Sequence, residues 1–460
     1  MTNDDNRSTY WLPFALVCSL FFLWGLANSL NGSLIRHFQF ALDLKRWQAG
    51  VVDSAFYLGY FVMAIPAGLF MRRHGYKRGI LAGLLLYAAG ALLFLPAAHI
   101  RVYGFFLFAL FTIASGLAFL ETAANLYVTV LGAKERAEWR INFAQSFNGI
   151  SIILGPVIGS MFIFSQQEYT PELLAALPPE QIEAARVQEA LSVRGPYGAI
   201  AGIVLFVALL FWLTPIPEVN REAEEAKPGV GVWQLLRRHR HLRLGVLAQL
   251  ANVGAQATLW GYFVDMKMDF SPSAHLAAVV PYAEFWHRAI KKAAESMTLE
   301  QMAGYHASFA LVLFMVGRFV GTYLMAQMAP RRVMVGYSLA AVGLVAVALL
   351  SGGIAAVACI SLVYFCQSIM FPTIFALGTK DMRPDEQKLA SSLLIMAIVG
   401  GAVMPPLAGL LSQGGGMHGA LLVPLVCFAY VAFYALWGCR TEGAGIDVPI
   451  GQGAGKDLAI

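Results

Sequence analysis

Charged residues are scarce in this chain of 460 residues, and their scarcity excludes an ordinary soluble protein. Asp, Glu, Lys and Arg make up 13% of the sequence, whereas hydrophobic residues make up 58%. A soluble protein of this length needs more polar side chains to cover its surface. Apolar runs of about 20 residues or more, long enough for a helix to cross a bilayer, recur along the whole chain. The sequence therefore predicts an all-α, multi-pass membrane protein.

Motifs of enzymes and metal sites are also missing from the sequence. The five cysteines show no CxxC or metal-binding spacing, and they fall inside or at the end of apolar runs, as small packing residues do. No nucleophile–base pair, metal cluster or phosphate-binding loop is visible. We therefore expect no enzymatic activity, no cofactor, no metal and no nucleic-acid partner. A membrane enzyme and a non-transporting sugar sensor stay open as less favoured alternatives.

Hydropathy divides the chain into about twelve predicted membrane spans. Their approximate limits are 11–37, 47–71, 77–98, 102–131, 140–164, 196–215, 243–266, 302–328, 333–350, 354–379, 387–412 and 419–438. The termini and the even-numbered loops hold 21 of the 32 Lys and Arg residues. Because basic residues are enriched in cytoplasmic loops, we expect both termini in the cytoplasm and the protein in the inner membrane.

The predicted spans form two halves that echo each other. We expect a six-helix half at 1–215, a charged cytoplasmic linker at 216–242, a second half at 243–440 and a tail at 441–460. A small residue followed about ten positions later by basic residues occurs at equivalent loops, and we assign structural or gating roles to Gly68, Arg78 and Gly321. Two such halves indicate a transporter built from repeats, with its site between them. We expect a monomer in the lipid bilayer.

An outer insertion follows span five in the first half and span seven in the second. The first, at 166–195, is acidic and amphipathic, and we expect a surface helix there. The second, at 271–300, is similar in placement and length.

Glu121 is a carboxylate in the middle of an apolar run. No other charge lies between Val102 and Leu131. An ionised acid is costly in hydrocarbon, so such a residue is by default a proton or substrate site. We predict that Glu121 couples protonation to substrate binding, with a structural carboxylate satisfied by amides as the alternative.

Amides and aromatic residues accompany this acid in the predicted spans. Because unsatisfied amides are unfavourable in lipid, these faces should point at protein or at a water-filled cavity. Neutral donors and acceptors suit sugar hydroxyls, and a Trp face suits the apolar face of a pyranose. Interhelical hydrogen bonding is the alternative for each amide. The candidate substrate-binding residues are Asn28, Ser29, Asn31, Gln145, Asn148, Gln249, Asn252, Gln256 and Trp260, together with Glu121.

Short motifs along nearly the whole chain resemble the fucose:proton symporter family of the major facilitator superfamily. They are Leu120–Asn125, Val128–Gly132, Ser54–Tyr57, Gly59–Phe61, Pro66–Gly68, Gly254–Gln256, Gly317–Phe319, Pro372–Phe375 and Gly400-Gly401. The resemblance implies a major facilitator fold and import of L-fucose, a monosaccharide, together with a proton. It also implies that Glu121 matches the family's carboxylate in span four.

The sequence departs from the family pattern in span one. Where the family has an acid for proton translocation, this chain has Gly32, while Asp53 occurs in span two. In an antiparallel hairpin rising about 1.5 Å per residue, the two positions lie at similar depth. Our hypothesis is that Asp53 has taken over proton coupling. An interfacial acid paired with Lys45 or Arg46 is the alternative. The lost acid also leaves open a sodium-coupled or facilitative carrier for a hexose or amino sugar.

Arg318 is a second charge inside a predicted span. It lies near the cytoplasmic end of span eight, where a long side chain can reach the interface. We assign it a structural or gating role as a latch to the following loop, with Asp381 or Asp385 as candidate partners.

Overall fold

The computed structural model describes residues 3–130, 137–164, 173, 176–215, 231–290, 297–382 and 384–440. Every regular element within these ranges is a helix, as predicted. The chain forms two compact units. Unit 1 comprises Met1–Glu224 and Tyr282–Ser308, and unit 2 comprises Glu225–Pro281 and Phe309–Ile460.

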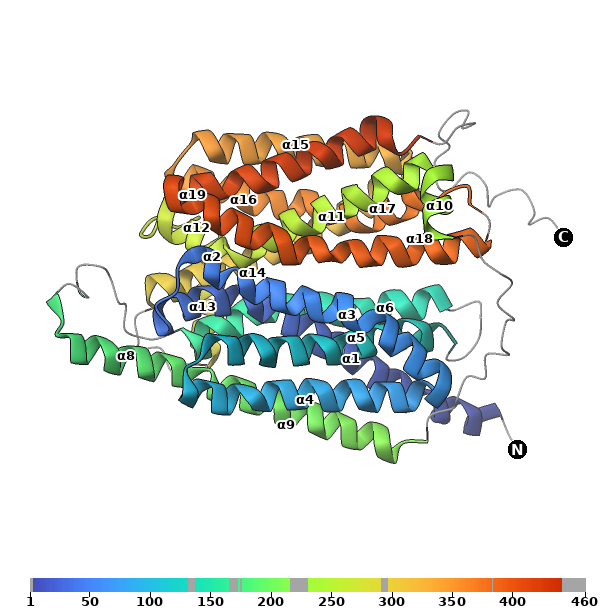
Figure 1. Ribbon diagram of the computed structural model, residues 1–460, viewed down its shortest axis with the longest axis horizontal. Coiled ribbons are helices and arrows are strands. Elements are labelled where there is room, and N and C mark those ends of the chain that lie inside the picture. Colours follow the sequence, from blue (N-terminus) through green and yellow to red (C-terminus); the bar gives the residue numbers. More distant parts are fainter. Residues whose placement is uncertain are drawn as a thin grey trace. The chain divides into compact units, whose positions relative to one another are not determined.

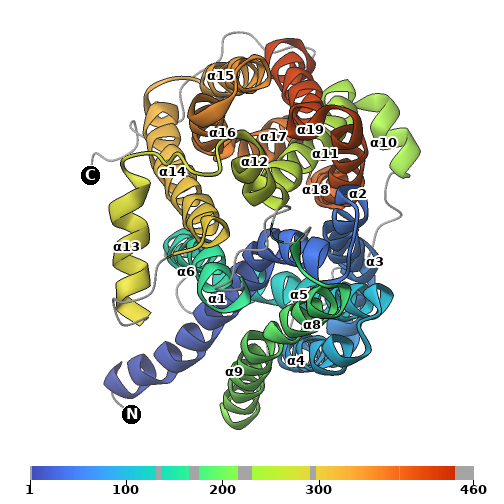
Figure 2. The same cartoon turned by 90° about the vertical axis from the view of Figure 1, so that its left-hand side faces the viewer.

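Unit 1 is a bundle of long helices (Figure 1). Its helices are α1 (Asn3–Ala41), α2 (Arg46–Ala49), α3 (Val51–His74), α4 (Tyr76–Ile100), α5 (Tyr103–Val130), α6 (Ala137–Ile158) with the π-helical turn η2 (Gly159–Ile163), α8 (Pro179–Ser192) and α9 (Arg194–Leu213). Helix α1 packs beside α6, and α4 packs beside both α5 and α9 (Figure 2). Most of α13 (Val279–Ile290) and the first turns of α14 (Leu299–Gln327) also belong to this unit.

Unit 2 contains more broken helices. They are α10 (Val232–Arg238), α11 (Arg240–Gly261), α12 (Phe263–Phe270), the rest of α14, α15 (Pro330–Leu350), α16 (Gly353–Gln367), α17 (Met370–Gly378), α18 (Pro384–Met396), η3 (Ala397–Val399), α19 (Gly400–Phe433) and η4 (Tyr434–Gly438). Helix α11 packs against α19, where Gly400 lies so close to α11 that a Cβ there would stand 2.0 Å from the Leu250 carbonyl oxygen.

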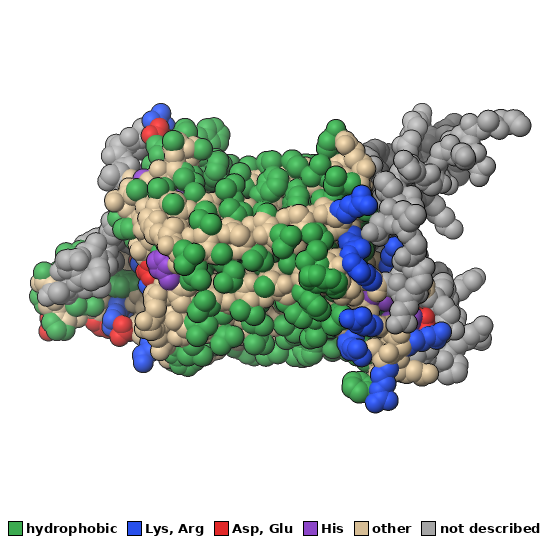
Figure 3. Space-filling view, turned by 90° about the horizontal axis from the view of Figure 1, so that it is seen from above, with side chains coloured by type: hydrophobic (Ala, Val, Ile, Leu, Met, Phe, Trp, Pro, Cys, Tyr) green, Lys and Arg blue, Asp and Glu red, His purple; other side chains and the backbone are tan. Residues whose placement is uncertain are grey.

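The helices account for the predicted spans. Ten stretches in the described part of the chain are long and apolar enough to cross a membrane. The stretch Ser392–Gly438 covers two predicted spans, which are separated by non-helical backbone at Gly415 and Gly416. Predicted span seven corresponds to α11, whose amides and basic residues make it more polar than the others. Figure 3 shows hydrophobic side chains over the middle of the face in view, with Lys and Arg gathered at its right-hand end.

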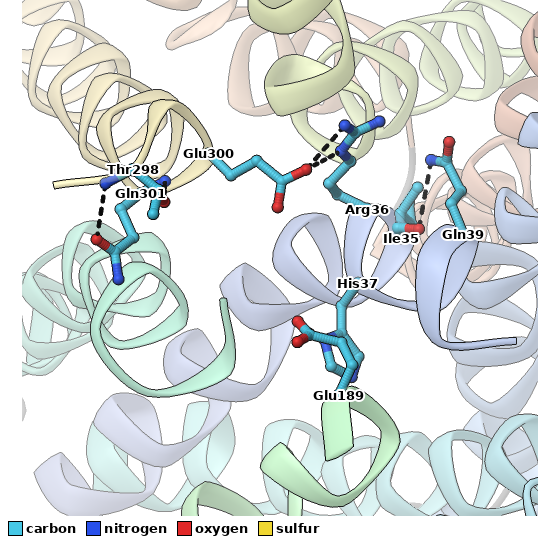
Figure 4. A network of polar contacts seen from close by, with 8 residues as sticks. All are labelled: Ile35, Arg36, His37, Gln39, Glu189, Thr298, Glu300 and Gln301. Atoms are coloured by element: carbon cyan, nitrogen blue, oxygen red, sulfur yellow. Dashed lines mark hydrogen bonds and ion pairs between the residues drawn. The ribbon is translucent and has the colours of Figure 1, made fainter. Parts of the chain in front are cut away.

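One segment of the second predicted half, Tyr282–Ser308, belongs to unit 1 instead. The Arg36 guanidinium on α1 forms an ion pair of 2.8 Å with Glu300 at the start of α14 (Figure 4). The Ser308 hydroxyl donates to the Ile153 carbonyl at 2.7 Å. These contacts anchor the start of α14 to α1 and α6.

The surface helix predicted between spans five and six is α8, whereas 165–172 and 174–175 of that insertion lie outside the described residues. Ion pairs tie α8 to the ends of its neighbours. Arg186 pairs with Asp43 at 2.6 Å, and Glu183 pairs with Arg101 at 2.5 Å. Glu189 lies 3.3 Å from His37, the residue next to Arg36 (Figure 4). The end of α1 therefore holds both α8 and the start of α14.

The repeated basic residues hold the ends of other helices. At the second residue of α4, the Lys77 ammonium donates to the carbonyls of Trp212 and Thr214 at the end of α9, at 3.0 and 2.8 Å. At the second residue of α15, the Arg331 guanidinium donates to the carbonyls of Ala435 and Leu436 in η4, at 3.0 and 2.6 Å. A cation at a helix C-terminus satisfies carbonyls that lack helical donors. The two units thus repeat one contact.

The residues of this motif that were assigned structural or gating roles differ in their contacts. Arg78 is exposed, and it is Lys77 that makes the contact with α9. A Cβ on Gly68 would meet no heavy atom within 4 Å, whereas one on Gly321 would stand 2.4 Å from Ile369. Close packing therefore explains Gly321 and does not explain Gly68 within its unit.

Candidate functional site

Glu121 lies on α5 of unit 1 and is half-buried. The hydroxyl of the next residue, Thr122, donates to the Ala118 carbonyl at 2.7 Å, so it does not donate to the Glu121 carboxylate. The buried Tyr60 hydroxyl on α3 lies beside Trp24 and within electrostatic range of Glu121. The acid therefore has the Tyr60 phenol near it, and that phenol in turn lies beside the Trp24 indole. Sequence reasoning missed Tyr60, although it belongs to the Gly59–Phe61 motif.

Asp53 on α3 contacts α1 at the residue before Gly32, as the hairpin argument predicts. The Asn31 amide donates to its carboxylate at 3.3 Å, which joins α1 to α3. Asp53 is 4% exposed and Asn31 is 3% exposed. Asp53 lies in the first turn of α3, and its observed partner is an amide of α1. Within unit 1, Asp53 is thus a second buried acid, and it is bonded to the residue that precedes Gly32.

Several polar residues of α1 and α6 take part in helix packing. The Ser29 hydroxyl donates to the Leu26 carbonyl at 3.1 Å and lies 3.5 Å from the Ser151 carbonyl oxygen. The Asn148 amide donates to the Phe21 carbonyl at 3.3 Å. A Cβ on Gly155 would stand 1.9 Å from the Ser29 hydroxyl, so the helices approach closely at that glycine. The geometry therefore gives Ser29 and Asn148 interhelical contacts.

The remaining two candidates of unit 1 stay partly accessible. Asn28 on α1 and Gln145 on α6 are both half-buried. They can offer neutral donors and acceptors to a bound sugar.

The candidates of unit 2 lie along one helix, α11. Gln249 and Asn252 are both 0% exposed, and neither the oxygen nor the nitrogen of either amide has a hydrogen-bond partner. Leaving a buried polar group unpaired costs about 1–3 kcal/mol. The two unpaired amides, one turn apart, destabilise the folded protein locally. A hydrogen-bonded ligand or water would remove that cost. Gln256, one turn further on, is half-buried.

Trp260 belongs to a compact aromatic cluster in unit 2. Its ring stacks on Tyr364 of α16, with centroids 5.8 Å apart and planes 16° apart. It meets the edge of Phe314 of α14, with centroids 5.3 Å apart. The Tyr364 hydroxyl donates to the Leu259 carbonyl at 3.1 Å, which fixes α16 against α11. The indole Nε1 is buried without a partner, so it is available to a hydroxyl group.

Arg318 contacts the helix break in predicted span ten. Its Nε donates to the Ser368 carbonyl at 3.3 Å, and the guanidinium lies 4.9 Å from the Phe314 ring centroid. In a helix, the Ser368 carbonyl would accept the N–H of residue 372, but that residue is Pro372, which has none. Arg318 therefore supplies the donor that proline lacks. Of the predicted partners, the Asp385 side chain lies outside those described.

Comparison with known proteins agrees with this architecture. The family model of the Major Facilitator Superfamily matches residues 14–398, from α1 into the turn η3. The chain belongs to the Major Facilitator Superfamily. Within it, the predicted resemblance to the fucose:proton symporters is confirmed, because the chain is 40% identical over 447 residues to the L-fucose-proton symporter of Escherichia coli. That match covers 95% of this chain and 96% of the other.

Two further comparisons bear on this superfamily member. The crystal structure of the Escherichia coli fucose:proton symporter matches with a TM-score of 0.64 and 38% identity, covering 94% of this chain and 100% of that one. A glucose/galactose transporter of Brucella abortus is 32% identical over 442 residues, covering 96% of this chain and 97% of that one. Relatives that match nearly the whole chain are thus named for different sugars.

Proposed function

We propose that this protein is a secondary carrier that imports L-fucose together with a proton, and that Glu121 couples the two. The proposal rests on a half-buried carboxylate in the middle of α5, in a chain 40% identical to an L-fucose-proton symporter. We propose further that it acts in the inner membrane with both termini in the cytoplasm, since 21 of the 32 Lys and Arg residues lie in the termini and the even-numbered loops. It is a carrier rather than an enzyme.

The coupling follows from the cost of burying charge. An ionised Glu121 is unfavourable in a closed, water-free site, whereas the neutral acid is tolerated and can donate a hydrogen bond to a sugar hydroxyl. A proton and a sugar together therefore allow the loaded carrier to change its access. Loss of the proton on the cytoplasmic side removes the donor and weakens sugar binding there. The proton gradient thereby drives accumulation of the sugar in the cell.

The amides and Trp260 supply the neutral part of sugar recognition. Hydroxyl groups both donate and accept, so Gln249, Asn252 and Gln256 suit them without adding charge. Trp260 offers an aromatic face to the apolar face of the ring. In unit 1, Asn28 and Gln145 add further amides, while Asp53 is the candidate for a second proton-carrying group.

A glucose or galactose carrier is the second candidate. The 32% identity to a glucose/galactose transporter favours it, and Gly32 at the expected acid position allows coupling other than to protons. The two candidates differ in substrate and driving ion, which one reconstituted system can separate.

Uptake into proteoliposomes tests the proposal. Labelled L-fucose, galactose and N-acetylglucosamine are offered with a pH gradient or a sodium gradient imposed separately. We expect fucose uptake that responds to the pH gradient alone. Fucose uptake indifferent to that gradient would reject proton coupling, and preference for galactose would favour the second candidate.

Glu121→Gln tests the coupling residue itself. The amide resembles the neutral acid in shape but cannot ionise, so it cannot release a proton during the cycle. We therefore expect sugar exchange across the membrane to persist, while uphill accumulation falls at least tenfold. Glu183→Gln, which alters an exposed acid on α8, is the matched control.

A further inference from the structure

Predicted span ten is broken near its middle. Helix α16 ends at Gln367, helix α17 begins at Met370, and the whole span runs over Gly353–Gly378. Pro372 explains the break, since it cannot donate to the carbonyl one turn before it. Irregular backbone at this depth of a membrane is tolerated where protein or a cavity satisfies it. Such breaks near the midplane are where carriers bind their substrates.

Gln367, the last residue before the break, has an unpaired amide. It is 2% exposed, and both its oxygen and its nitrogen lack a hydrogen-bond partner. A glutamine that served only to join helices would bond across to a neighbour. The amide is therefore held at this position without a contact that explains it.

The surroundings of Gln367 connect it to the predicted sugar face of unit 2. One turn before it, Tyr364 stacks on Trp260. One residue after it, the Ser368 carbonyl accepts from Arg318. Arg318 in turn lies over Phe314, which meets the edge of Trp260. Helices α11 and α14 thus contact the residues on both sides of Gln367, whose amide has no hydrogen-bond partner.

We propose that Gln367 is a sugar-recognition residue that binds two adjacent hydroxyl groups of the substrate, and that Arg318 is the positioning residue that holds the break. The amide oxygen accepts from one hydroxyl, and the amide nitrogen donates to its neighbour. This inference rests on the proposed function. It adds a contact from span ten to the amides of α11. Since Gln367 is closed off in this structure, sugar reaches it when the surrounding helices move.

Binding of monodeoxy sugars tests the contact. Affinities of the full-length protein and of Gln367→Met are measured by calorimetry for L-fucose and its 2-, 3- and 4-deoxy analogues. We expect Gln367→Met to weaken L-fucose binding by about tenfold, as expected when a hydrogen-bonded substrate group loses its partner. The penalty should shrink for the analogues that lack one of the two contacted hydroxyls and stay in full for the analogue that keeps both. Gln367→Asn, which keeps the amide on a shorter side chain, serves if the Met variant does not fold.

Stability of the sugar-free protein separates recognition from packing. Removing an unpaired buried amide leaves no partner unsatisfied, so Gln367→Met should keep or raise the melting temperature. Ser361→Ala, which removes a buried hydroxyl bonded within the same helix, should leave sugar affinity unchanged. An equal penalty for every analogue, or none, overturns the role of Gln367 while the proposed function stands. A wild-type protein that binds none of these sugars overturns both.

Discussion

Two acids of unit 1 differ in what surrounds each carboxyl group. Asp53 is buried and accepts a hydrogen bond from Asn31, whereas Glu121 is half-buried near the Tyr60 hydroxyl. Burial disfavours the charged form of both acids, and the Asn31 amide offsets part of that cost at Asp53. Each residue is a candidate proton carrier, and substitution can separate their roles.

Asp53→Asn tests the second acid. The change keeps the shape of the side chain and removes its ionisable proton. If Asp53 carries part of the proton path, sugar-dependent proton uptake should fall at least tenfold, whereas sugar counterflow should persist. Proton movement is followed with a pH electrode in proteoliposomes.

Asp43→Asn is the control for that experiment. Asp43 is 73% exposed and pairs with Arg186 at the end of α1. Such surface pairs contribute little, so the control should transport as the wild type does. Undiminished proton uptake in Asp53→Asn would sink the hypothesis and leave Glu121 as the single coupling acid.

Span ten, as an element, depends on one long-range contact at its break. Arg318→Met leaves the buried Ser368 carbonyl without a donor, which should cost about 1–3 kcal/mol. Pro372→Ala restores the N–H that a continuous helix would supply to that carbonyl. We therefore expect the double variant to regain most of the lost stability, measured as the melting temperature in detergent.

Two comparisons make the Arg318 and Pro372 experiment decisive. Arg318→Lys keeps a donor and should lose less stability than Arg318→Met. Simple additivity of Arg318→Met and Pro372→Ala would show that the guanidinium and the missing N–H are not coupled through Ser368.

The contacts of Lys77 and Arg331 with helix ends give a second prediction about helix stability. Lys77→Met and Arg331→Met each remove a cation from carbonyls at a helix C-terminus, which should cost about 1 kcal/mol each. Because the two contacts lie in different units, their effects should add. Arg332→Met, at an exposed position next to Arg331, should leave the melting temperature unchanged. A loss in the control equal to that of Arg331→Met would contradict the capping role.

The sequence was enough to predict the helices, but not the contacts between them. Spans follow from local hydrophobicity, so α4 and α15 could be located without any partner. The choice between Lys77 and Arg78 could not be made, because one residue turns the side chain by about 100° around the helix. Likewise, the pattern of Ser29 and Asn148 could not distinguish helix packing from substrate contact. Pro372 signalled a bend, but its donor, Arg318, comes from another helix.

For the whole molecule, the division of the chain follows contacts rather than sequence order. The first turns of α14 belong to unit 1, and the rest of this helix belongs to unit 2. Arg36 and Ser308 provide contacts that hold these first turns to unit 1. Hydropathy alone places the whole of α14 in the second half, because ion pairs at helix ends leave no hydropathy signal.

Topology of the whole chain is testable with single cysteines. The five native cysteines are buried or half-buried, so an introduced exposed thiol should dominate labelling. Gln188 on α8 and Arg332 at the start of α15 are exposed at segments assigned to opposite sides of the membrane. We expect an impermeant maleimide to label Gln188→Cys in intact cells and Arg332→Cys only after permeabilisation. The reverse pattern would place the termini outside, and Glu121 would then meet the proton gradient in the opposite direction.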